Sequence, residues 1–522
     1  MLSVVILWHC CAAAGAGTSR PNGETQPPLQ PADTRDGAPR PSVASVQTSP
    51  PYQCVITDAR YGAKPDNTTI NTAAIQRAID ACHAASPAWS RVVVPEGAFK
   101  TGSLELRSNM ELHLEAGAGL YGSTNPSDYP IVEGLPFGKM WRALISGYNL
   151  TNVKVTGSNT AVPAEDDRGA SIIDGVGWWW NCLLYESHGS LTSNIPNPDA
   201  APYCKIFNPH NRTVAQVAGM TGRAPLRPKL VEMFNCTSVT IADFTAQNAA
   251  CWTIHPTYSR DVVVQRMTVR GPREIGGVDG IDPDSCVNCV IEDCHVDSGD
   301  DGISIKSYNY SYVPGPTPCK NVTIRRTTVL SRNVCLGAST SGGVFDVTFE
   351  DIILGDQATA SLPWAIKFKI SAGVIENVTF RRIQIGPVGD TPWMYPDDRA
   401  GAFMIDFFDH NRSDPVTWVR NIAFEDINVV SAKILGHISG PGSCIDGLIV
   451  RNLTVGKGRL NHVNATTNIL PRQLGWGGCT GVDRTDAVID GVVPPLVCGG
   501  CEVARCMTTH WEPSKLDARS TT

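Results

Sequence analysis

After its first 17 residues the sequence lacks any run of roughly 18 uninterrupted apolar residues, so a membrane-spanning helix is not expected. Charged residues are scarce, at 18% of the 522 residues, and the formal net charge is -7. This balance gives no indication of binding to nucleic acid or to an anionic membrane surface. An anionic ligand would therefore need a local basic site.

Helical periodicity is also scarce. It is confined to residues 69–85 (TINTAAIQRAIDACHAA), where five apolar positions follow a helical spacing: Ala74, Ile75, Ala78, Ile79 and Cys82. After this segment helix signals largely vanish. We expect one amphipathic helix near the start of the folded region.

Short segments with alternating apolar residues, rich in Val, Ile and Thr, fill the rest of the chain at intervals of roughly 20 to 30 residues. Each unit begins approximately with Asn or Asp, Val, any residue, then Ile or Phe, as in NVTIRRTTV (321–329) and NVTFRRIQI (377–385). Such repeats bury their inward side chains against neighbouring repeats. The pattern predicts an all-β protein, a right-handed single-stranded parallel β-helix, whose open end the early helix caps.

The chain divides into four segments. Residues 1–17 are predicted to be a signal peptide, although no Lys or Arg precedes the apolar run, and residues 18–50 a disordered spacer rich in Pro and Ser. Residues 51–455 form the expected β-helix domain. Residues 456–522 lose the repeat, and we expect a cysteine-containing C-terminal cap and tail.

Cysteines and glycosylation sequons indicate a secreted protein. Removal of Cys10 and Cys11 with the signal peptide would leave 16 of the 18 cysteines, an even number. About ten Asn-x-Ser/Thr sequons occur, although an Asn- and Thr-rich β protein also contains some by chance. They include Asn67, Asn149, Asn235, Asn321, Asn377 and Asn452. We therefore expect an extracellular glycoprotein with disulfide bonds.

Two Cys-x-x-Cys pairs, Cys286 with Cys289 and Cys498 with Cys501, have a spacing found in zinc sites. No second ligand pair stands at zinc spacing, and a secretory route favours disulfides. We expect no metal. Cys54 with Cys82 is a plausible bridge, as are pairs within Cys498, Cys501 and Cys506.

Two acidic segments, GGVDGIDPDS (276–285) and SGDDGISIKS (298–307), lie about one repeat apart. If one coil takes about 22 residues, Asp279 and Asp301 occupy equivalent places on adjacent coils, about 4.8 Å apart, with Asp300 beside Asp301. The three carboxylates are therefore expected to converge on one patch of the outer surface. Clustered carboxylates bind a cation or keep one member protonated, and glycoside hydrolysis needs the second arrangement. The alternative is a stack of solvent-exposed Asp-rich turns, to which we assign Asp282 and Asp284.

Several separated segments resemble the polygalacturonase-type glycoside hydrolases, family 28, which include polygalacturonases and rhamnogalacturonan hydrolases. GVDGIDPDS and GDDGISIKS are similar to that family's Asn-Thr-Asp-Gly and Asp-Asp segments, and the 21- and 22-residue intervals from Asp279 agree. ARYGAKPDNTTINTAAIQRAIDAC, LEAGAGLYGSTNPSDYP, SIIDGVGWWW, RPKLVEMFNC and WTIHPTYSRDVVV also resemble it. The resemblance covers about residues 54–455 and implies a pectin-lyase-like solenoid.

The resemblance implies an inverting hydrolase that cleaves galacturonic-acid-containing pectin without a cofactor. Asp300 would be the general acid, and Asp279 with Asp301 would hold and deprotonate the attacking water. Lys367 and Lys369 correspond to the family's Arg-Ile-Lys segment, and strand alternation points both to one face, where they can bind a uronate carboxylate. Alternatively they are solvated surface charges. We expect a monomer whose partner is the pectic polysaccharide alone.

Two departures from the family leave alternatives open. Gly277-Val278-Asp279 replaces Asn-Thr-Asp, and LSRNVCLGAST (330–340) lacks the histidine of the family's Gly-His-Gly segment. Arg332 either supplies positive charge in place of that histidine or packs against a coil. His255 either lines the sugar groove or is structural. A rhamnogalacturonan or xylogalacturonan hydrolase therefore stays an alternative, as do a β-eliminating lyase and a non-catalytic pectin-binding protein.

Overall fold

The computed structural model describes residues 52–135, 138–163, 169–181, 227–273, 275–308, 317–358, 362–370, 373–389, 401–407, 418–432, 434–439, 444–456 and 488–490. The predicted signal peptide and spacer, and most of the predicted C-terminal segment, lie outside these ranges. Within them, no helix has the length and apolar character needed to cross a membrane.

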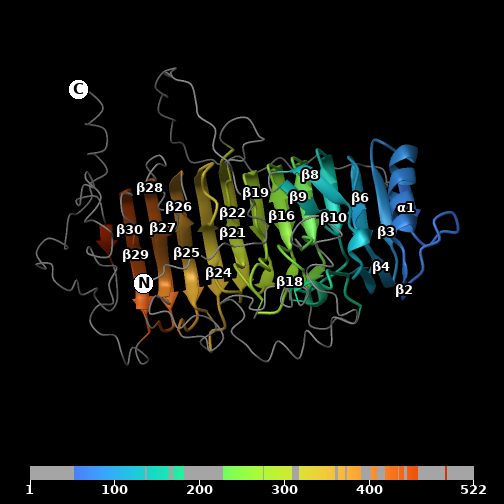
Figure 1. Ribbon diagram of the computed structural model, residues 1–522. Helices are drawn as coiled ribbons and strands as arrows, with labels where there is room; N and C mark the ends of the chain where they lie inside the picture. The colour runs from blue at the N-terminus through green and yellow to red at the C-terminus, as the bar shows by residue number, and fades with distance from the viewer. Residues whose placement is uncertain are drawn as a thin grey trace, which may run out of the picture.

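The described residues wind into a right-handed parallel β-helix, which confirms the predicted fold (Figure 1). Its coils follow one another along a single axis, from α1 at one end to β30 near the other. Successive coils pair in parallel, as in β3 with β6 and β28 with β30. In the second half, single long strands replace pairs of shorter strands. For example, the two short strands β19 and β20 both pair with the long strand β22.

The largest sheet comprises β1 (Tyr52–Val55), β2 (Asp66–Ile70), β3 (Ser90–Val94), β4 (Gly97–Thr101), β6 (Met110–Leu114), β7 (Ala118–Gly122), β11 (Thr151–Thr156), β12 (Ile172–Asp174), β14 (Thr237–Ala242), β15 (Thr245–Gln247), β17 (Arg260–Gln265), β18 (Thr268–Arg270), β19 (Val287–Glu292), β20 (His295–Asp297), β22 (Cys319–Val329), β24 (Val344–Leu354), β26 (Val374–Ile385), β28 (Trp418–Val429), β30 (Cys444–Val455) and β31 (Val488–Asp490). A second wall comprises β5 (Leu104–Glu105), β10 (Ile145–Tyr148), β13 (Val231–Phe234) and β16 (Ile254–Thr257), then β21 (Ile303–Ile305), β23 (Val334–Gly337), β25 (Trp364–Ile370), β27 (Gly401–Phe407) and β29 (Ile434–Ser439). The antiparallel pair β8 (Ile131–Leu135) and β9 (Gly138–Trp141), the 3-10 helix η1 (Pro126–Asp128) and the α-helix α1 (Thr72–Ala85) complete the described elements.

The core is a set of side-chain stacks along the axis. Phe349, Phe380 and Phe424 are in register on β24, β26 and β28, with ring centroids 4.6 Å and 5.2 Å apart. All three are buried. A stack of this kind explains why single coils have no stable core of their own, since each inward ring is covered only by its neighbours.

Bends in the coils explain the repeated Asn or Asp of the sequence pattern. Asn321, Asp346, Asn377 and Asn421 lead equivalent units on successive long strands, and all have φ between 52° and 59°. Asn and Asp tolerate this left-handed conformation better than other non-glycine residues. Their side chains also form a ladder, in which Asn377 donates to Asp346 at 2.9 Å and Asn421 donates to Asn377 at 3.0 Å.

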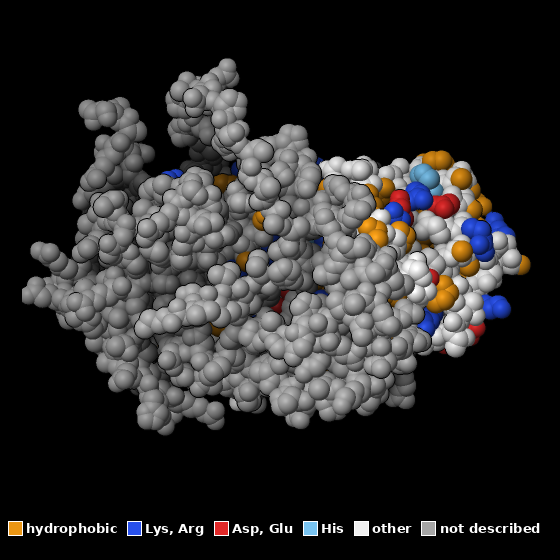
Figure 2. Space-filling view, viewed as in Figure 1, with side chains coloured by type: hydrophobic (Ala, Val, Ile, Leu, Met, Phe, Trp, Pro, Cys, Tyr) orange, Lys and Arg blue, Asp and Glu red, His pale blue; other side chains and the backbone are white. Residues whose placement is uncertain are grey.

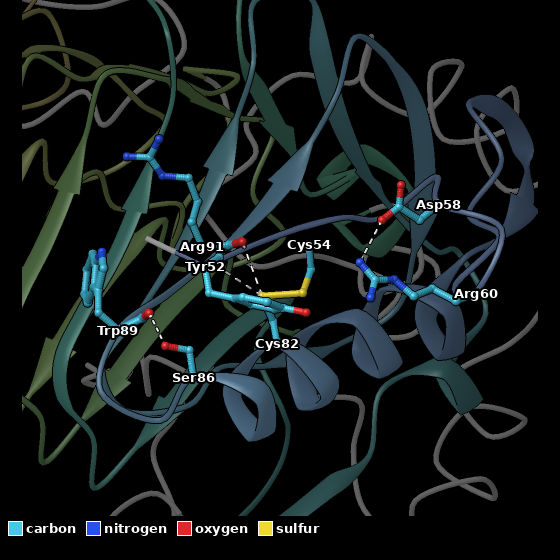
Figure 3. The surroundings of a disulfide bond; sticks show 8 residues. All are labelled: Tyr52, Cys54, Asp58, Arg60, Cys82, Ser86, Trp89 and Arg91. Carbon is cyan, nitrogen blue, oxygen red and sulfur yellow. Dashed lines mark hydrogen bonds and ion pairs between the residues drawn. A yellow bond between two sulfur atoms is a disulfide. The ribbon is translucent and has the colours of Figure 1, made fainter. Parts of the chain in front are cut away.

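Helix α1 lies at the N-terminal end of the stack (Figure 1), and its five predicted apolar positions are buried. A disulfide joins Cys54 of β1 to Cys82 of α1 (Figure 3), as predicted. The helix is thereby tied to the first coil. Its capping role stays a prediction.

The disulfide expected for Cys286 or Cys289 is wrong: both are buried thiols outside any disulfide. Cys289 lies inside the coil, in register with Val262 and Val322, while the Cys286 thiol donates to the carbonyl of Pro256 at 3.2 Å. These side chains fill core positions. Burial raises the pKa of Cys289 to about 12, which keeps this thiol protonated at neutral pH. Cys498, Cys501 and Cys506 lie outside the described residues.

Candidate active site

The two acidic segments meet in the second wall of the β-helix. Bridges join Ile254 of β16 to Ile281, and Ile281 to Ile303 of β21. The N–H of Gly280 also donates to the carbonyl of Asp301 at 2.9 Å. Asp279 and Asp301 therefore occupy equivalent places on adjacent coils, as the 22-residue interval predicts.

The three predicted catalytic carboxylates are brought together but are not solvent-exposed. Asp279, Asp300 and Asp301 have relative exposures of 4%, 1% and 3%. The sequence pattern suggested a patch on the outer surface. The difference arises because three cations, described next, enter the cluster and permit its burial.

Each carboxylate has its own cationic partner. Lys306 Nζ lies 2.8 Å from Asp279 Oδ2, Arg332 Nη1 lies 3.1 Å from Asp300 Oδ1, and Lys369 Nζ lies 2.6 Å from Asp301 Oδ2. Asp300 Oδ2 also accepts the backbone N–H of Gly277, whose φ of 72° suits glycine. Gly277 stands where the family has the Asn of its Asn-Thr-Asp segment, and its backbone N–H donates to Asp300.

The surrounding charges shift the pKa values of Asp279 and Asp301 in opposite directions. Burial raises the pKa of Asp279 to about 6, with Asp300 and Asp301 adding to the shift and Lys306 opposing it. Burial also opposes ionisation of Asp301, but Lys369, Lys306 and Lys367 outweigh it and hold the pKa of Asp301 well below its usual range. One carboxylate is therefore firmly ionised while its neighbour titrates near neutrality.

The predicted basic residues lie on the same wall. Lys367 and Lys369 of β25 point to one face, and the two residues are 6% and 5% exposed, so the alternative of solvated charges is wrong. Lys367 Nζ lies 3.7 Å from the ring centroid of Trp364. Burial, together with the charge of Lys369, lowers the pKa of Lys367 to about 8.

Arg332 supplies positive charge beside Asp300 in the segment where the family's histidine is missing. Its side chain is 6% exposed, and its Nη1 contacts the carboxylate directly. Of the two interpretations left open by the sequence, the structure favours a cation in the acidic cluster. Whether Arg332 also contacts substrate stays a prediction.

Asp282 and Asp284 are corrected from exposed turn residues to buried members of the cluster. Their exposures are 0% and 1%. Asp282 Oδ2 lies 2.9 Å from Lys306 Nζ, and Asp284 is bridged in register with both Thr257 and Lys306. The acidic segment runs within the wall, where Lys306 compensates its charge.

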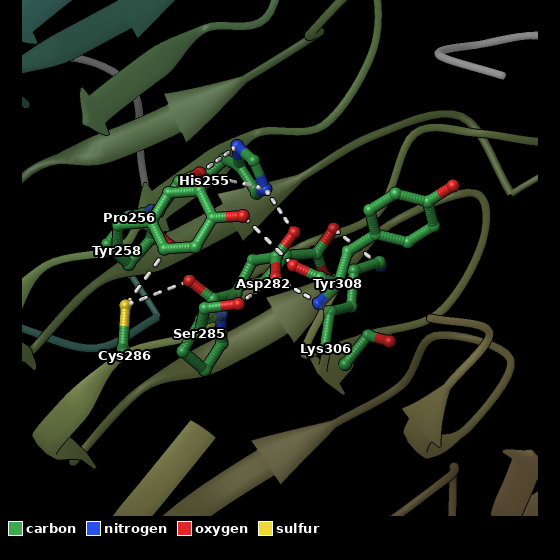
Figure 4. A network of polar contacts seen from close by, with 12 residues as sticks. His255, Pro256, Tyr258, Asp282, Ser285, Cys286, Lys306 and Tyr308 are labelled. Atoms are coloured by element: carbon green, nitrogen blue, oxygen red, sulfur yellow. Dashed lines mark hydrogen bonds and ion pairs between the residues drawn. The ribbon is translucent and has the colours of Figure 1, made fainter. Parts of the chain in front are cut away.

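His255 belongs to a polar network that continues from the acidic segment onto the preceding coils, since its Nε2 lies 3.8 Å from Asp284 Oδ2 (Figure 4). Its Nδ1 lies 3.0 Å from Lys229 Nζ and 2.9 Å from Thr257 Oγ1, and its side chain is fully buried. Lys229 also pairs with Glu232 at 2.5 Å. These contacts favour the structural interpretation of His255, while a contact with sugar stays a prediction.

Lys306 is the member of the site that the sequence analysis missed. Alternation in GISIKS places Ile303 and Ile305 inward and Ser304 and Lys306 on the outward face, one coil beyond Asp284. The signal was therefore present. Figure 4 shows Lys306 directed toward Asp282 from the neighbouring coil.

Charged side chains elsewhere are more mixed. At the α1 end of the face in Figure 2, acidic and basic side chains of the described residues are interspersed with hydrophobic ones. Among the described residues, no cluster of three or more His, Cys, Asp or Glu side chains has an arrangement suited to a metal ion. The acidic cluster is instead interleaved with ammonium and guanidinium groups.

Comparison with known proteins agrees with this geometry. The model of glycosyl hydrolases family 28 matches residues 216–392, which include the whole acidic cluster. A probable polygalacturonase of Vitis vinifera is 28% identical over 83% of this chain and 78% of its own length. An exo-poly-alpha-D-galacturonosidase of Dickeya chrysanthemi is 30% identical over 58% of this chain and 50% of its own.

Among solved structures, an exopolygalacturonase from Thermotoga maritima has the same fold, with a TM-score of 0.59 and 23% identity, over 78% of this chain and 87% of that one. The family match contains the carboxylates and the cations paired with them, and the sequence relatives extend the similarity over most of the β-helix. The chain is therefore similar to glycosyl hydrolases family 28 over the residues that form the acidic cluster.

Proposed function

We propose that the protein cleaves galacturonic-acid-containing pectin chains by acid–base hydrolysis with inversion at the anomeric carbon. The observation that carries the proposal is the buried cluster of Asp279, Asp300 and Asp301, in which each carboxylate has a separate cation. Similarity to glycosyl hydrolases family 28 supports a glycoside hydrolase. The names of its relatives support a galacturonan as substrate.

In the proposed reaction Asp300 gives its proton to the leaving glycosidic oxygen as the C–O bond breaks. Asp279 and Asp301 orient a water molecule, which attacks the anomeric carbon and passes its proton to Asp279. The Oδ1 atom of Asp279 supports this assignment, because it is buried and has no hydrogen-bond partner among the described residues. It is a free acceptor inside the cluster.

Lys367 is proposed to bind a uronate carboxylate of the substrate. It lies on the same face of β25 as Lys369, which contacts Asp301, so a ligand held by Lys367 would lie near the carboxylate cluster. The Trp364 ring restrains the ammonium group by a cation–π contact. Arg332 and His255 are the other proposed substrate contacts.

We further propose that the protein is secreted and acts as a monomer on the polysaccharide alone. The Cys54–Cys82 disulfide supports an oxidising compartment. Pectic polymers are extracellular in plant cell walls, which fits such a destination. N-glycosylation is testable by mass spectrometry of the secreted protein.

The proposal is tested by product chromatography after incubation of the purified protein with polygalacturonate and, separately, with rhamnogalacturonan. Saturated galacturonate products released by the wild type, and not by Asp300→Asn, would support hydrolysis and identify the backbone. A product with the ultraviolet absorbance of an unsaturated uronate would instead identify a β-eliminating lyase. Polymer retention without any product would indicate a binding protein.

A further inference from the structure

Lys306 is a buried lysine shared by two carboxylates. Its Nζ lies 2.8 Å from Asp279 Oδ2 and 2.9 Å from Asp282 Oδ2, and its side chain is 6% exposed. Both contacts use the Oδ2 atom of the aspartate. The Oδ1 atoms of Asp279 and Asp282 are buried and have no hydrogen-bond partner among the described residues.

An aromatic ring two coils before Lys306 restrains its ammonium group. Lys306 Nζ lies 4.6 Å from the ring centroid of Trp252, within range of a cation–π contact. Lys306 is also in register with Asp284, two residues beyond Asp282. The backbone, the ring and the two carboxylates together limit the position of the ammonium group.

We propose that Lys306 is a positioning residue of the hydrolase, which holds Asp279 by one oxygen and thereby directs the other oxygen toward the attacking water. Asp282 is the second carboxylate paired with the Lys306 ammonium, and it helps to hold that group against the coil that contains Asp279. This inference rests on the proposed function. It adds a residue to which the sequence analysis assigned no role.

The charge on Asp279 then depends on the groups that face it. These are Lys306, Asp282, Asp300 and Asp301, with Lys369 and Lys367 beyond Asp301. Lys306 favours the ionised carboxylate, and the neighbouring acids oppose it. Because the proposed base must be ionised to accept a proton from water, Lys306 helps to set the lower pH limit of activity.

The test is the pH dependence of kcat/KM for pectic polymer hydrolysis. Lys306→Met is expected to move the acid limb to higher pH by about one unit or more, with a loss of kcat and little change in KM. Lys306→Arg keeps the positive charge, so its acid limb should lie close to that of the wild type. An unchanged limb in Lys306→Met would overturn the proposal, even if its melting temperature falls.

Lys229→Met is the matched control, because Lys229 is also a buried lysine beside the Trp252 ring but pairs with Glu232. Its acid limb should stay at the wild-type pH. If Lys306→Met does not fold, Asp282→Asn is the substitute test. In that variant Lys306 pairs with Asp279 alone, so the acid limb of kcat/KM should move to lower pH. No movement, or movement to higher pH, would contradict the proposal.

The test separates this inference from the proposed function. A wild type that hydrolyses the polymer while neither Lys306→Met nor Asp282→Asn shifts the limb would overturn the role of Lys306 only. A wild type that releases no saturated product from any pectic polymer would overturn the proposed function, and the role of Lys306 with it.

Discussion

Lys369 Nζ lies 2.6 Å from Asp301 Oδ2, although 68 residues separate them along the chain. The coil of β23 stands between the two, and there Gly337 is in register with Lys369. Gly337 has a φ of 111°, and a Cβ there would clash with the carbonyl oxygen of Lys369, so glycine permits the two coils to pack closely at this point. The β-helix thus places a cation from a later coil on a carboxylate of the site.

This contact changes the effect expected of Lys369→Met. A lysine that only bound substrate would affect KM, but removal of Lys369 leaves Asp301 buried without its nearest cation. We expect kcat to fall by about 100-fold with a smaller change in KM. Steady-state kinetics on polygalacturonate measure both, and an increase in KM at unchanged kcat would assign Lys369 to substrate binding instead.

Lys367→Met should have the opposite kinetic signature, an increase in KM of about tenfold with little change in kcat. The matched pair of variants on one strand therefore separates substrate binding from support of the carboxylates. If Lys367→Met lowers kcat as much as Lys369→Met does, the proposed uronate contact is wrong.

Lys367→Met should also stabilise the protein at neutral pH. The folded-state pKa of about 8 is below the unfolded value of about 10.4, because burial and Lys369 disfavour the charged form. The charged lysine therefore destabilises the fold below pH 8, and this cost declines as pH rises from 8 toward 10.4. Denaturant unfolding should show a gain on the order of 1 kcal/mol at pH 7 that shrinks above pH 8. A gain that grows with pH would contradict this sign.

Asp300→Asn should reduce turnover by at least about 100-fold, because an amide cannot supply the proton for the leaving oxygen. The fold should persist, since the inward stacks are untouched. Asp346→Asn is the control, because Asp346 is an exposed ladder residue that accepts from Asn377 far from the cluster. Equal activity of the two variants would show that Asp300 is not the acid.

Glu350→Gln tests an alternating ladder of charge on the outer face. Glu350 stands between Arg325 and Arg381 in register, and Arg381 and Arg382 both donate to it. Partial burial opposes its ionisation, but these arginines outweigh burial and lower its pKa. The ion pairs of Glu350 therefore stabilise the fold fully above about pH 4.3, the pKa of Glu in the unfolded chain. This stabilisation is lost as pH falls through the lower pKa of the folded state.

We expect Glu350→Gln to lower the free energy of unfolding by about 1 kcal/mol at pH 7. The difference from wild type should decline as pH falls below about 4.3 and should shrink in high salt. Glu376→Gln, on the neighbouring strand β26, is the control, because no ion pair of Glu376 is found among the described residues. A loss that is the same at pH 3 and pH 7 would rule out the charge ladder as its source.

The β-helix could be predicted from the sequence because its determinants are local and repeated. Alternation and an Asn or Asp at the bend recur in most units, and the interval from Asp279 to Asp301 equals one coil. The same bends limit the inference from sequons. Asn321 and Asn377 lie at left-handed bends and donate to ladder neighbours, so their abundance has a structural cause whether or not they carry glycans.

The electrostatics of the site could not be predicted from local pattern. Burial of Asp282 depends on Lys306, one coil later, and the state of Asp301 depends on Lys369, two coils later. Pairings of this kind follow from the register of the coils. The same limit explains the error at Cys286 and Cys289, whose spacing alone does not show that both lie in the core.

The proposed roles of Asp279, Asp300 and Asp301 require inversion at the anomeric carbon. Time-resolved proton NMR of the reducing ends released from α-linked polygalacturonate determines whether inversion occurs. We predict that β-anomeric reducing ends appear first, that α-anomeric ends follow only at the rate of mutarotation, and that Asp300→Asn releases neither. Initial release of α-anomeric ends would show retention and would contradict the proposed roles of Asp279, Asp300 and Asp301.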